Sequence, residues 1–140
     1  MYDETNGFPL WMDIYGEESA LSLEILNLNY TIKFVPEIVV NHRVDRAKRI
    51  EQKRNYFRFE KQLQNSIRYY LVYFPNPILK IAKLLFHNFK KYALKDIKCF
   101  QLFWKVIFNA IFNFFKIVKY RKPVSKQAIQ KLFELKGLQF

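Results

Sequence analysis

The first regular hydrophobic pattern in the chain begins at Glu17. Leu21, Ile25 and Leu28 follow it at the i, i+4, i+7 spacing that gathers apolar side chains on one side of a helix. Asn29 comes directly after this pattern, and asparagine tolerates the left-handed backbone conformation that ends many helices. The pattern therefore predicts a helix that starts at Glu17, ends before Asn29 and turns its three apolar residues toward the core.

Residues 1–15, which precede this helix, show neither a helix period nor a strand period. Asn6-Gly7 and Pro9 are turn signals within the segment. The same segment holds several large apolar side chains, among them Trp11, so it has enough apolar surface to pack against the rest of the chain. We therefore expect a packed loop before the helix.

Two short stretches after the helix have β character. Residues 30–35 and 38–40 are rich in β-branched and aromatic side chains. Pro36 separates them, and a proline cannot donate a hydrogen bond to a strand ladder. The pattern predicts two short β segments arranged like a hairpin.

The chain beyond residue 44 has a helical pattern almost throughout. Asp45 can cap a long helix, which the motif Phe74-Pro75-Asn76-Pro77 would end. Three further helices are expected at residues 78–94, 97–118 and 125–135, and Ser125 is a suitable N-cap for the last one. The apolar residues expected on the inner side of the long helix are Ile50, Phe57, Leu63, Ile67 and Phe74.

These elements predict an α+β fold class that is mostly α. A length of 140 residues allows one ordinary domain at most. Three parts follow one another along the chain: a mixed segment at residues 1–43, a long basic helix at 44–75 and a basic amphipathic helical tail at 76–140.

Charge divides the chain into two unlike parts. The sequence has 24 lysines and arginines and 12 acidic residues, a net charge of +12. Residues 1–42 contain seven of the acids and one lysine, so the positive excess lies entirely in residues 43–140. Such an excess suggests a polyanionic partner, either a nucleic acid or an anionic membrane surface.

Several classes of protein are disfavoured by simple features. Cys99 is the single cysteine, which excludes an intrachain disulfide framework and a thiolate metal cluster and fits a reducing compartment. The first ten residues have no basic region followed by an apolar core, so they do not resemble a secretory signal. Polar residues interrupt the longest apolar run, residues 102–118, and we expect no transmembrane helix there. A cytoplasmic location is therefore expected.

A series of motifs occurs in order along residues 6–43. The matching positions are Gly7-Phe8, Tyr15-Gly16-Glu17-Glu18, Leu21, Leu26, Tyr30, Val35-Pro36-Glu37 and His42. In this order they resemble the C-terminal catalytic segment of family 2 glycosyltransferases with the GT-A fold, of the rhamnosyltransferase-like kind. The resemblance implies that residues 1–43 are an incomplete C-terminal segment of a GT-A α/β domain.

The resemblance also implies an activity and roles for particular residues. The reaction would be inverting transfer of a sugar from a nucleotide-sugar donor to a saccharide or lipid-linked acceptor. Glu18 would be the general base and Glu17 its support, while Gly7, Phe8 and Trp11 would border the acceptor pocket. His42 would help to hold a divalent metal, Mg²⁺ or Mn²⁺, on the donor diphosphate.

The chain departs from the family pattern at several positions. Ala20 stands where the family has an aspartate, Glu24 where it has an arginine, and Pro9-Leu10 where it has Asp-Glu. The nucleotide-binding half, which the family places upstream of these motifs, is absent from this sequence. We therefore expect the chain to be inactive alone and to be the tail of an enzyme: a truncated gene product, a split one that is completed by a separate N-terminal half, or one that starts at an internal Met. The alternative is a catalytically inactive remnant or a peripheral membrane-binding helical module.

The basic tail has its own pattern. Residues 78–122 contain eleven basic residues and one acid, and between 101 and 119 the polar residues form one narrow stripe beside a wide apolar face. A basic helix with such a face suits an anionic inner leaflet, so we expect a peripheral location at the inner face of the membrane. Alternatively, these helices pack on one another or on the absent half. No nucleic-acid partner is expected, because no recognised binding motif occurs and the aromatic residues share faces with Ile and Leu.

Overall fold

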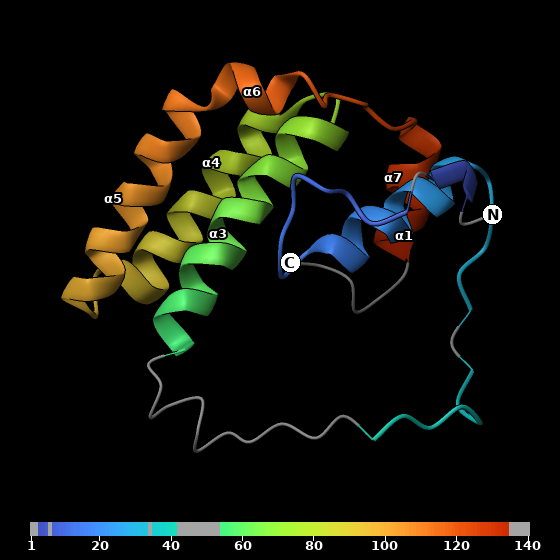
Figure 1. Cartoon of the computed structure of the whole chain (residues 1–140), viewed down its shortest axis with the longest axis horizontal. Coiled ribbons are helices and arrows are strands. Elements are labelled where there is room, and N and C mark those ends of the chain that lie inside the picture. Colours follow the sequence, from blue (N-terminus) through green and yellow to red (C-terminus); the bar gives the residue numbers. More distant parts are fainter. Residues whose placement is uncertain (1–2, 6, 34, 42–53, 135–140) are drawn as a thin grey trace.

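The computed structural model describes residues 3–5, 7–33, 35–41 and 54–134, and this part of the chain is mostly helical (Figure 1). The elements are η1 (Asp3–Thr5), α1 (Glu17–Asn27), α3 (Arg54–Tyr73), α4 (Pro77–Asn88), the π-helical turn η2 (Phe89–Ala93), α5 (Ile97–Phe112), α6 (Phe114–Val118) and α7 (Lys126–Glu134). The expectation of a mostly α chain is confirmed for the described residues.

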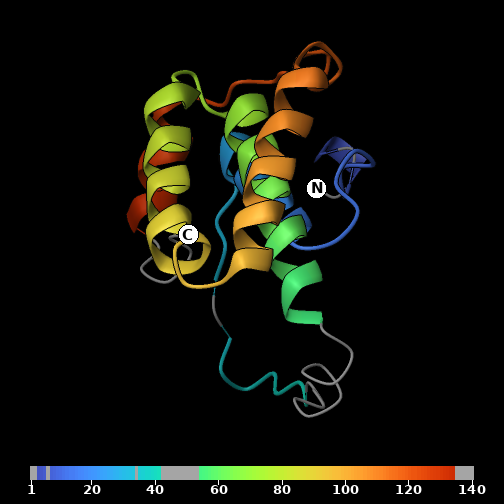
Figure 2. The ribbon, with the colours of Figure 1, turned by 90° about the vertical axis from the view of Figure 1, so that its left-hand side faces the viewer.

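Helix α3 lies at the centre of the arrangement. It contacts α4, α5 and α6, while α1 packs against α7 and lies beside the C-terminal half of α3 (Figures 1 and 2). Two clusters of buried side chains hold these elements together. One joins the middle of α3 to η2 and α5 through Phe59, Leu63, Ile67, Ala93, Cys99, Phe103 and Val106. The other joins α1, the end of α3, Ile117 of α6 and α7 through Met12, Ala20, Leu23, Leu26, Val72, Tyr73, Phe74, Ile117, Val124, Ala128 and Leu132.

Most helix ends follow from the residues found there. The N–H groups of Tyr30 and Asn29 donate to the carbonyls of Ile25 and Leu26, and Asn29 has a φ of 65°. This is a Schellman ending with asparagine in the left-handed position, as expected from the sequence. The Ser125 hydroxyl accepts a hydrogen bond from the N–H of Ala128 at 3.1 Å, which confirms Ser125 as the N-cap of α7.

The boundaries of the other helices agree closely with the sequence pattern. Helix α3 ends at Tyr73 and α4 begins at Pro77, which stands at the first helical position, where a proline needs no hydrogen-bond partner. The helix expected at residues 97–118 is present but divided into α5 and α6 at Asn113, whose side chain donates to the carbonyl of Asn109. Asp96 caps α5 by accepting from the N–H groups of Lys98 and Cys99 at 2.8 and 2.9 Å.

The described residues of the two β segments expected after α1, which lie within 30–33 and 35–41, form no strand. Ile38, Val39 and Val40 are 72%, 86% and 79% exposed, so their β-branched side chains are largely open to solvent. A strand needs a neighbour for its N–H and C=O groups, and no described segment pairs with this one.

The inner side of two helices also differs from the prediction. In α1 the buried residues are Ala20, Leu23 and Leu26, whereas Leu28 is exposed and Leu21 and Ile25 are partly exposed. The sequence of α1 carries two overlapping apolar stripes, and the position of α7 decides which one is covered.

In α3, Phe57 is 45% exposed instead of buried, and Phe59 takes the inner position. The confirmed inner residues of α3 are Leu63 and Ile67, and Phe74 is buried just after its end; Ile50 lies outside the described residues.

Candidate functional site

The loop before α1 is shaped by an unusual pair of backbone conformations. Tyr15 and Gly16 both have positive φ angles, 66° and 111°. Gly16 is the N-cap of α1, and its φ lies in a region that side-chain-bearing residues rarely adopt. Tyr15 pays a conformational cost at such a φ because it carries a Cβ. The Tyr-Gly pair therefore turns the chain sharply into the helix that carries the two glutamates.

Helix α3 holds this loop in place through its side chains. The Asn65 amide donates to the carbonyls of Ile14 and Tyr15 at 2.7 and 3.0 Å, and Arg68 donates to the carbonyl of Trp11 at 3.1 Å. Asn65 is only 1% exposed. Lys61 forms an ion pair with Asp13 at the surface. Three residues from one side of α3 thus fix the backbone that leads to Glu17 and Glu18.

Glu17 and Glu18 occupy the first turn of α1 but differ in their surroundings. Glu18 is exposed and lines a groove at the surface, whereas Glu17 is half-buried. One carboxylate oxygen of Glu17, Oε2, is buried without a hydrogen-bond partner among the described residues. Both carboxylates lie at the positive end of the α1 dipole, which stabilises negative charge. Of the pair, Glu18 is the more accessible to a dissolved molecule.

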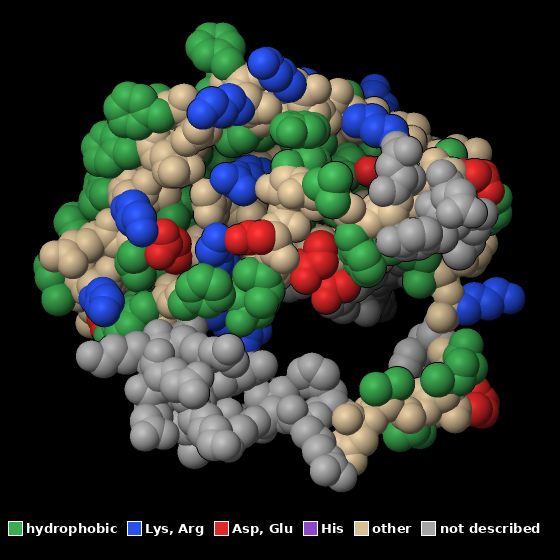
Figure 3. Space-filling model, in the orientation of Figure 1, with side chains coloured by type: hydrophobic (Ala, Val, Ile, Leu, Met, Phe, Trp, Pro, Cys, Tyr) green, Lys and Arg blue, Asp and Glu red, His purple; other side chains and the backbone are tan. Residues whose placement is uncertain are grey.

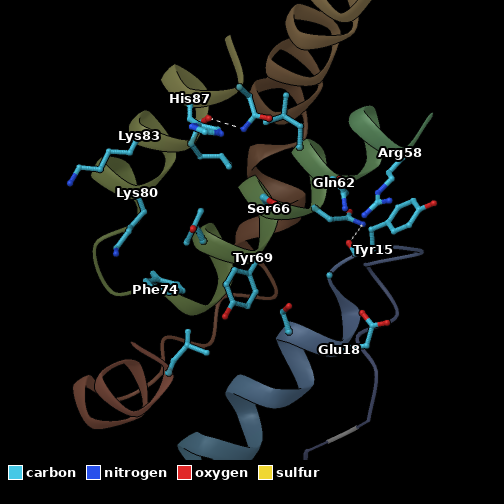
Figure 4. A pocket seen from close by; sticks show the side chains of 18 of the residues that line it. Tyr15, Glu18, Arg58, Gln62, Ser66, Tyr69, Phe74, Lys80, Lys83 and His87 are labelled. Atoms are coloured by element: carbon cyan, nitrogen blue, oxygen red, sulfur yellow. Dashed lines mark hydrogen bonds between the residues drawn. The ribbon is translucent and has the colours of Figure 1, made fainter. Parts of the chain in front are cut away.

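The groove beside Glu18 has a volume of about 820 Å³ and runs between α1, α3, α4 and α7. Figure 4 shows Tyr15 and Arg58 near Glu18 on one side, with Lys80 and Lys83 extending from α4 on the other. Ser19, Ser22, Gln62, Ser66, Tyr69 and Tyr70 supply further polar groups to its wall. The groove therefore combines one carboxylate with several hydroxyl, amide and cationic groups.

The charge of the groove is predominantly positive. Arg58, Lys80, Lys83 and Lys91 line it, and Glu18 is the one carboxylate among its lining residues. Within the described part of the chain, none of these four cations forms an ion pair with a carboxylate. Instead, Arg58 lies 5.6 Å from the centre of the Tyr15 ring, and the Lys80 ammonium lies 4.3 Å from the centre of the Phe133 ring. Such a wall favours an anionic ligand.

The residues expected to border an acceptor pocket line a different hollow. Gly7, Phe8 and Trp11 surround a depression of about 270 Å³, together with Glu24, Tyr73, Tyr120 and Lys122. The Trp11 ring packs against the rings of Tyr73 and Tyr120, with centroids 6.1 and 6.2 Å apart. The structure thus brings Gly7, Phe8 and Trp11 together, but it does not bring them to the hollow that Glu18 lines.

Two departures from the family pattern have structural roles here. Ala20 is fully buried in the core around α1 and α7. Glu24 accepts a hydrogen bond from the Tyr73 hydroxyl at 2.6 Å and forms an ion pair with Lys122 at 3.1 Å. Position 20 is therefore used for packing, and position 24 for joining α1 to α3 and to the segment before α7.

The expected metal ligand, His42, lies outside the described residues. Among the residues that are described, no group of three or more His, Cys, Asp or Glu side chains could hold a metal ion. A divalent cation prefers several oxygen ligands, and the described acids are dispersed or engaged with other side chains. The described side chains therefore do not make a metal site by themselves.

Several residues of the loop contacts and of the groove are not individually predicted from the sequence. The sequence predicts only basic helices for the segments of Asn65 and Arg68, which hold the loop, and of Arg58, Lys80 and Lys83, which give the groove its charge. Asn65 lies between Leu63 and Ile67, but its neighbours Gln64 and Ser66 are polar as well, so nothing in the sequence distinguishes it. The convergence of the cations has no signal in the sequence either, because it depends on how α3 and α4 pack.

Comparison of the chain with protein-family models, with curated proteins and with solved structures finds no significant match. A separate search of the helices in the described part of the chain finds none that is long and apolar enough to cross a membrane.

Proposed function

We propose that this chain is the C-terminal part of an inverting family 2 glycosyltransferase, in which Glu18 is the general base. The observation that carries this proposal is the position of Glu18: it is exposed in the first turn of α1, on the wall of the 820 Å³ groove. The motif Tyr15-Gly16-Glu17-Glu18 supports it, because the two left-handed residues before α1 set the carboxylate at the start of the helix.

In the proposed reaction the Glu18 carboxylate removes the proton from an acceptor hydroxyl. The oxygen forms a bond to the anomeric carbon of the donor sugar as the bond from that carbon to the nucleoside diphosphate breaks, which inverts the configuration. The diphosphate leaves with the electron pair, and Glu18 later releases its proton to water. General bases of this kind require direct hydrogen-bond contact with the hydroxyl, which an exposed side chain on an open groove permits.

The cationic wall of the groove supports phosphate-bearing substrates. Arg58 and Lys80 lie on opposite sides of the groove from each other, so an elongated anionic molecule could contact both while it reaches Glu18 (Figure 4). Nucleotide-sugar donors and lipid-linked saccharide acceptors both carry phosphates. In a complete enzyme, a divalent metal, Mg²⁺ or Mn²⁺ with His42 as a ligand, would stabilise the leaving diphosphate.

A second candidate function is favoured by the roles of Ala20 and Glu24. Both positions carry polar site residues in the resembled family. Here Ala20 is buried, and the Glu24 carboxylate is bound by Tyr73 and Lys122. A chain whose former site positions serve packing alone would be a catalytically inactive remnant or a helical module that binds membranes. In either case we place the protein at the cytoplasmic side of an anionic membrane, because its net charge is +12.

Substitution of Glu18 by glutamine tests the proposed function. The chain is combined with a donor-binding half, and transfer of labelled sugar is measured beside binding of the donor. We expect Glu18→Gln to reduce transfer by roughly 100- to 10,000-fold without changing donor binding. Glu134→Gln, at the exposed end of α7, is the matched control and should leave transfer unchanged. Transfer near the normal rate with Glu18→Gln would remove Glu18 from the role of base.

A further inference from the structure

The outer side of α5 and α6 exposes a row of large apolar side chains. Trp104, Phe108 and Ile111 follow one another at intervals of four and three residues, so they lie on one side of α5, and Phe115 follows in α6 after the break at Asn113. They are 40%, 54%, 63% and 81% exposed. Figure 3 shows apolar side chains along this edge of the molecule. We call the following residues the α5–α6 face: Ile97, Trp104, Phe108, Ile111, Phe112 and Phe115.

This exposure is not a consequence of loose packing of the helix. The opposite side of α5 is well buried, since Cys99, Phe103 and Val106 are 8%, 4% and 2% exposed against α3 and η2. The helix therefore has two apolar sides, and the fold covers one of them. Contiguous apolar surface of this kind marks an interaction site.

Positive charge accompanies the α5–α6 face. Residues 97–122 contain no aspartate or glutamate. Lys98, Lys116 and Lys119 are exposed, and within the described part of the chain none of them pairs with a carboxylate; Lys105 is paired with Glu60 at 2.7 Å. An apolar surface flanked by unpaired cations matches a partner that is apolar within and negatively charged at its surface.

We infer that the α5–α6 face docks on the surface of an anionic lipid bilayer. The aromatic and aliphatic side chains would enter the boundary between headgroups and acyl chains, to a depth of about 5–10 Å, while the lysines contact acidic headgroups. A second copy of the chain would carry the same positive charge on its own face, so the two faces would repel each other. The charge therefore favours the bilayer over a dimer.

The inferred surface is separate from the groove that carries Glu18. None of the six residues of the α5–α6 face lines that groove, and α5 lies on the other side of the molecule from α1 and α7 (Figure 1). Docking would leave the groove accessible. The inference does not depend on the proposed sugar transfer, and either can fail without the other.

Vesicle flotation of the whole 140-residue chain tests the inference. We expect the protein to float with vesicles of phosphatidylglycerol and phosphatidylcholine, and at least about tenfold more weakly with phosphatidylcholine alone, because each lysine near an anionic surface contributes roughly fivefold. Phe112→Ala together with Phe115→Ala should weaken binding to the anionic vesicles by on the order of tenfold or more. Val39→Ala, at a similarly exposed apolar residue outside the α5–α6 face, should not weaken this binding.

Trp104 provides a direct measure of insertion. Its fluorescence should shift to shorter wavelength on anionic vesicles and should be quenched by lipids brominated in the acyl chains, and this quenchable signal should disappear in Trp104→Phe. Lys116→Gln together with Lys119→Gln should weaken binding to the anionic vesicles but not to vesicles of phosphatidylcholine. Absence of flotation, equal binding to both kinds of vesicle, or a stable dimer that Phe112→Ala dissociates in the absence of lipid would overturn the inference.

Discussion

The hydroxyl of Tyr73, near the end of α3, donates a hydrogen bond of 2.6 Å to Oε1 of Glu24 in α1. The other carboxylate oxygen of Glu24 pairs with Lys122 at 3.1 Å. Tyr73 is 2% exposed, and burial, followed by the hydrogen bond to Glu24, raises the pKa of its phenol. One carboxylate thus joins three segments that are far apart in the sequence.

Tyr73→Phe removes the hydroxyl, so the Glu24 carboxylate, which is largely shielded from water, loses one of its two partners. We expect a loss of about 1–3 kcal/mol in the free energy of unfolding, as is typical of a shielded hydrogen bond to a charged group. Lys122→Met, at a half-exposed ion pair, should cost less than about 1 kcal/mol. Urea unfolding of both variants makes the comparison. An equal loss of unfolding free energy in the two variants would show that the hydrogen bond from Tyr73 stabilises the fold no more than the ion pair with Lys122.

Ala20→Asp introduces the residue type that the resembled family has at this position. Because Ala20 is fully buried among the residues around α1 and α7, a carboxylate there would have no water and no cation. The expected loss of stability is at least about 3 kcal/mol. Ser19→Asp, one residue earlier in the same turn, is the control and should change stability by less than about 0.5 kcal/mol. A stable Ala20→Asp variant would contradict the position of α1 against α7.

Asn65→Ala removes the amide that holds the carbonyls of Ile14 and Tyr15. We expect a loss of about 1–3 kcal/mol in the free energy of unfolding and faster chymotrypsin cleavage after Tyr15 in the native state. Asn55→Ala, on the exposed side of α3, should affect neither quantity. If cleavage after Tyr15 stayed at its original rate, Asn65 would not be what fixes the loop.

We expect the stability of α5 to depend on pH through Asp96. Its hydrogen bond from the N–H of Cys99, followed by that from the Tyr56 hydroxyl, holds the pKa of Asp96 below the ordinary 3.8. A carboxylate whose pKa is lower in the folded state than in the unfolded state stabilises the fold at pH values above its unfolded-state pKa. This contribution is lost as the pH falls through the folded-state pKa.

The melting temperature should therefore decrease as the pH falls below about 4, and part of this decrease should be absent in Asp96→Asn, since asparagine caps a helix without ionising. Asp96→Ala should melt at a lower temperature than either protein at neutral pH. Identical acid profiles for the original protein and Asp96→Asn would mean that the cap does not contribute to the pH dependence.

The helices of this protein were largely predictable from local features. Ser125, Pro77 and Asn29 act at helix ends through interactions with their own neighbours in the sequence, and a local interaction is visible in the sequence. The same holds for the position of Glu17 and Glu18 in the first turn of α1. The wide apolar side of residues 101–119 was also visible, because helical periodicity alone defines it.

Tertiary structure decided the rest. The choice between two apolar stripes in α1 depends on where α7 lies, and the absence of strands in the described residues after α1 depends on whether a partner strand exists. The groove of Glu18 gathers Arg58 from α3 and Lys80 from α4, and the hollow of Trp11 gathers Tyr73 and Lys122. These contacts join residues far apart in the chain, so no local pattern encodes them; they arise only when α3 packs against its neighbours.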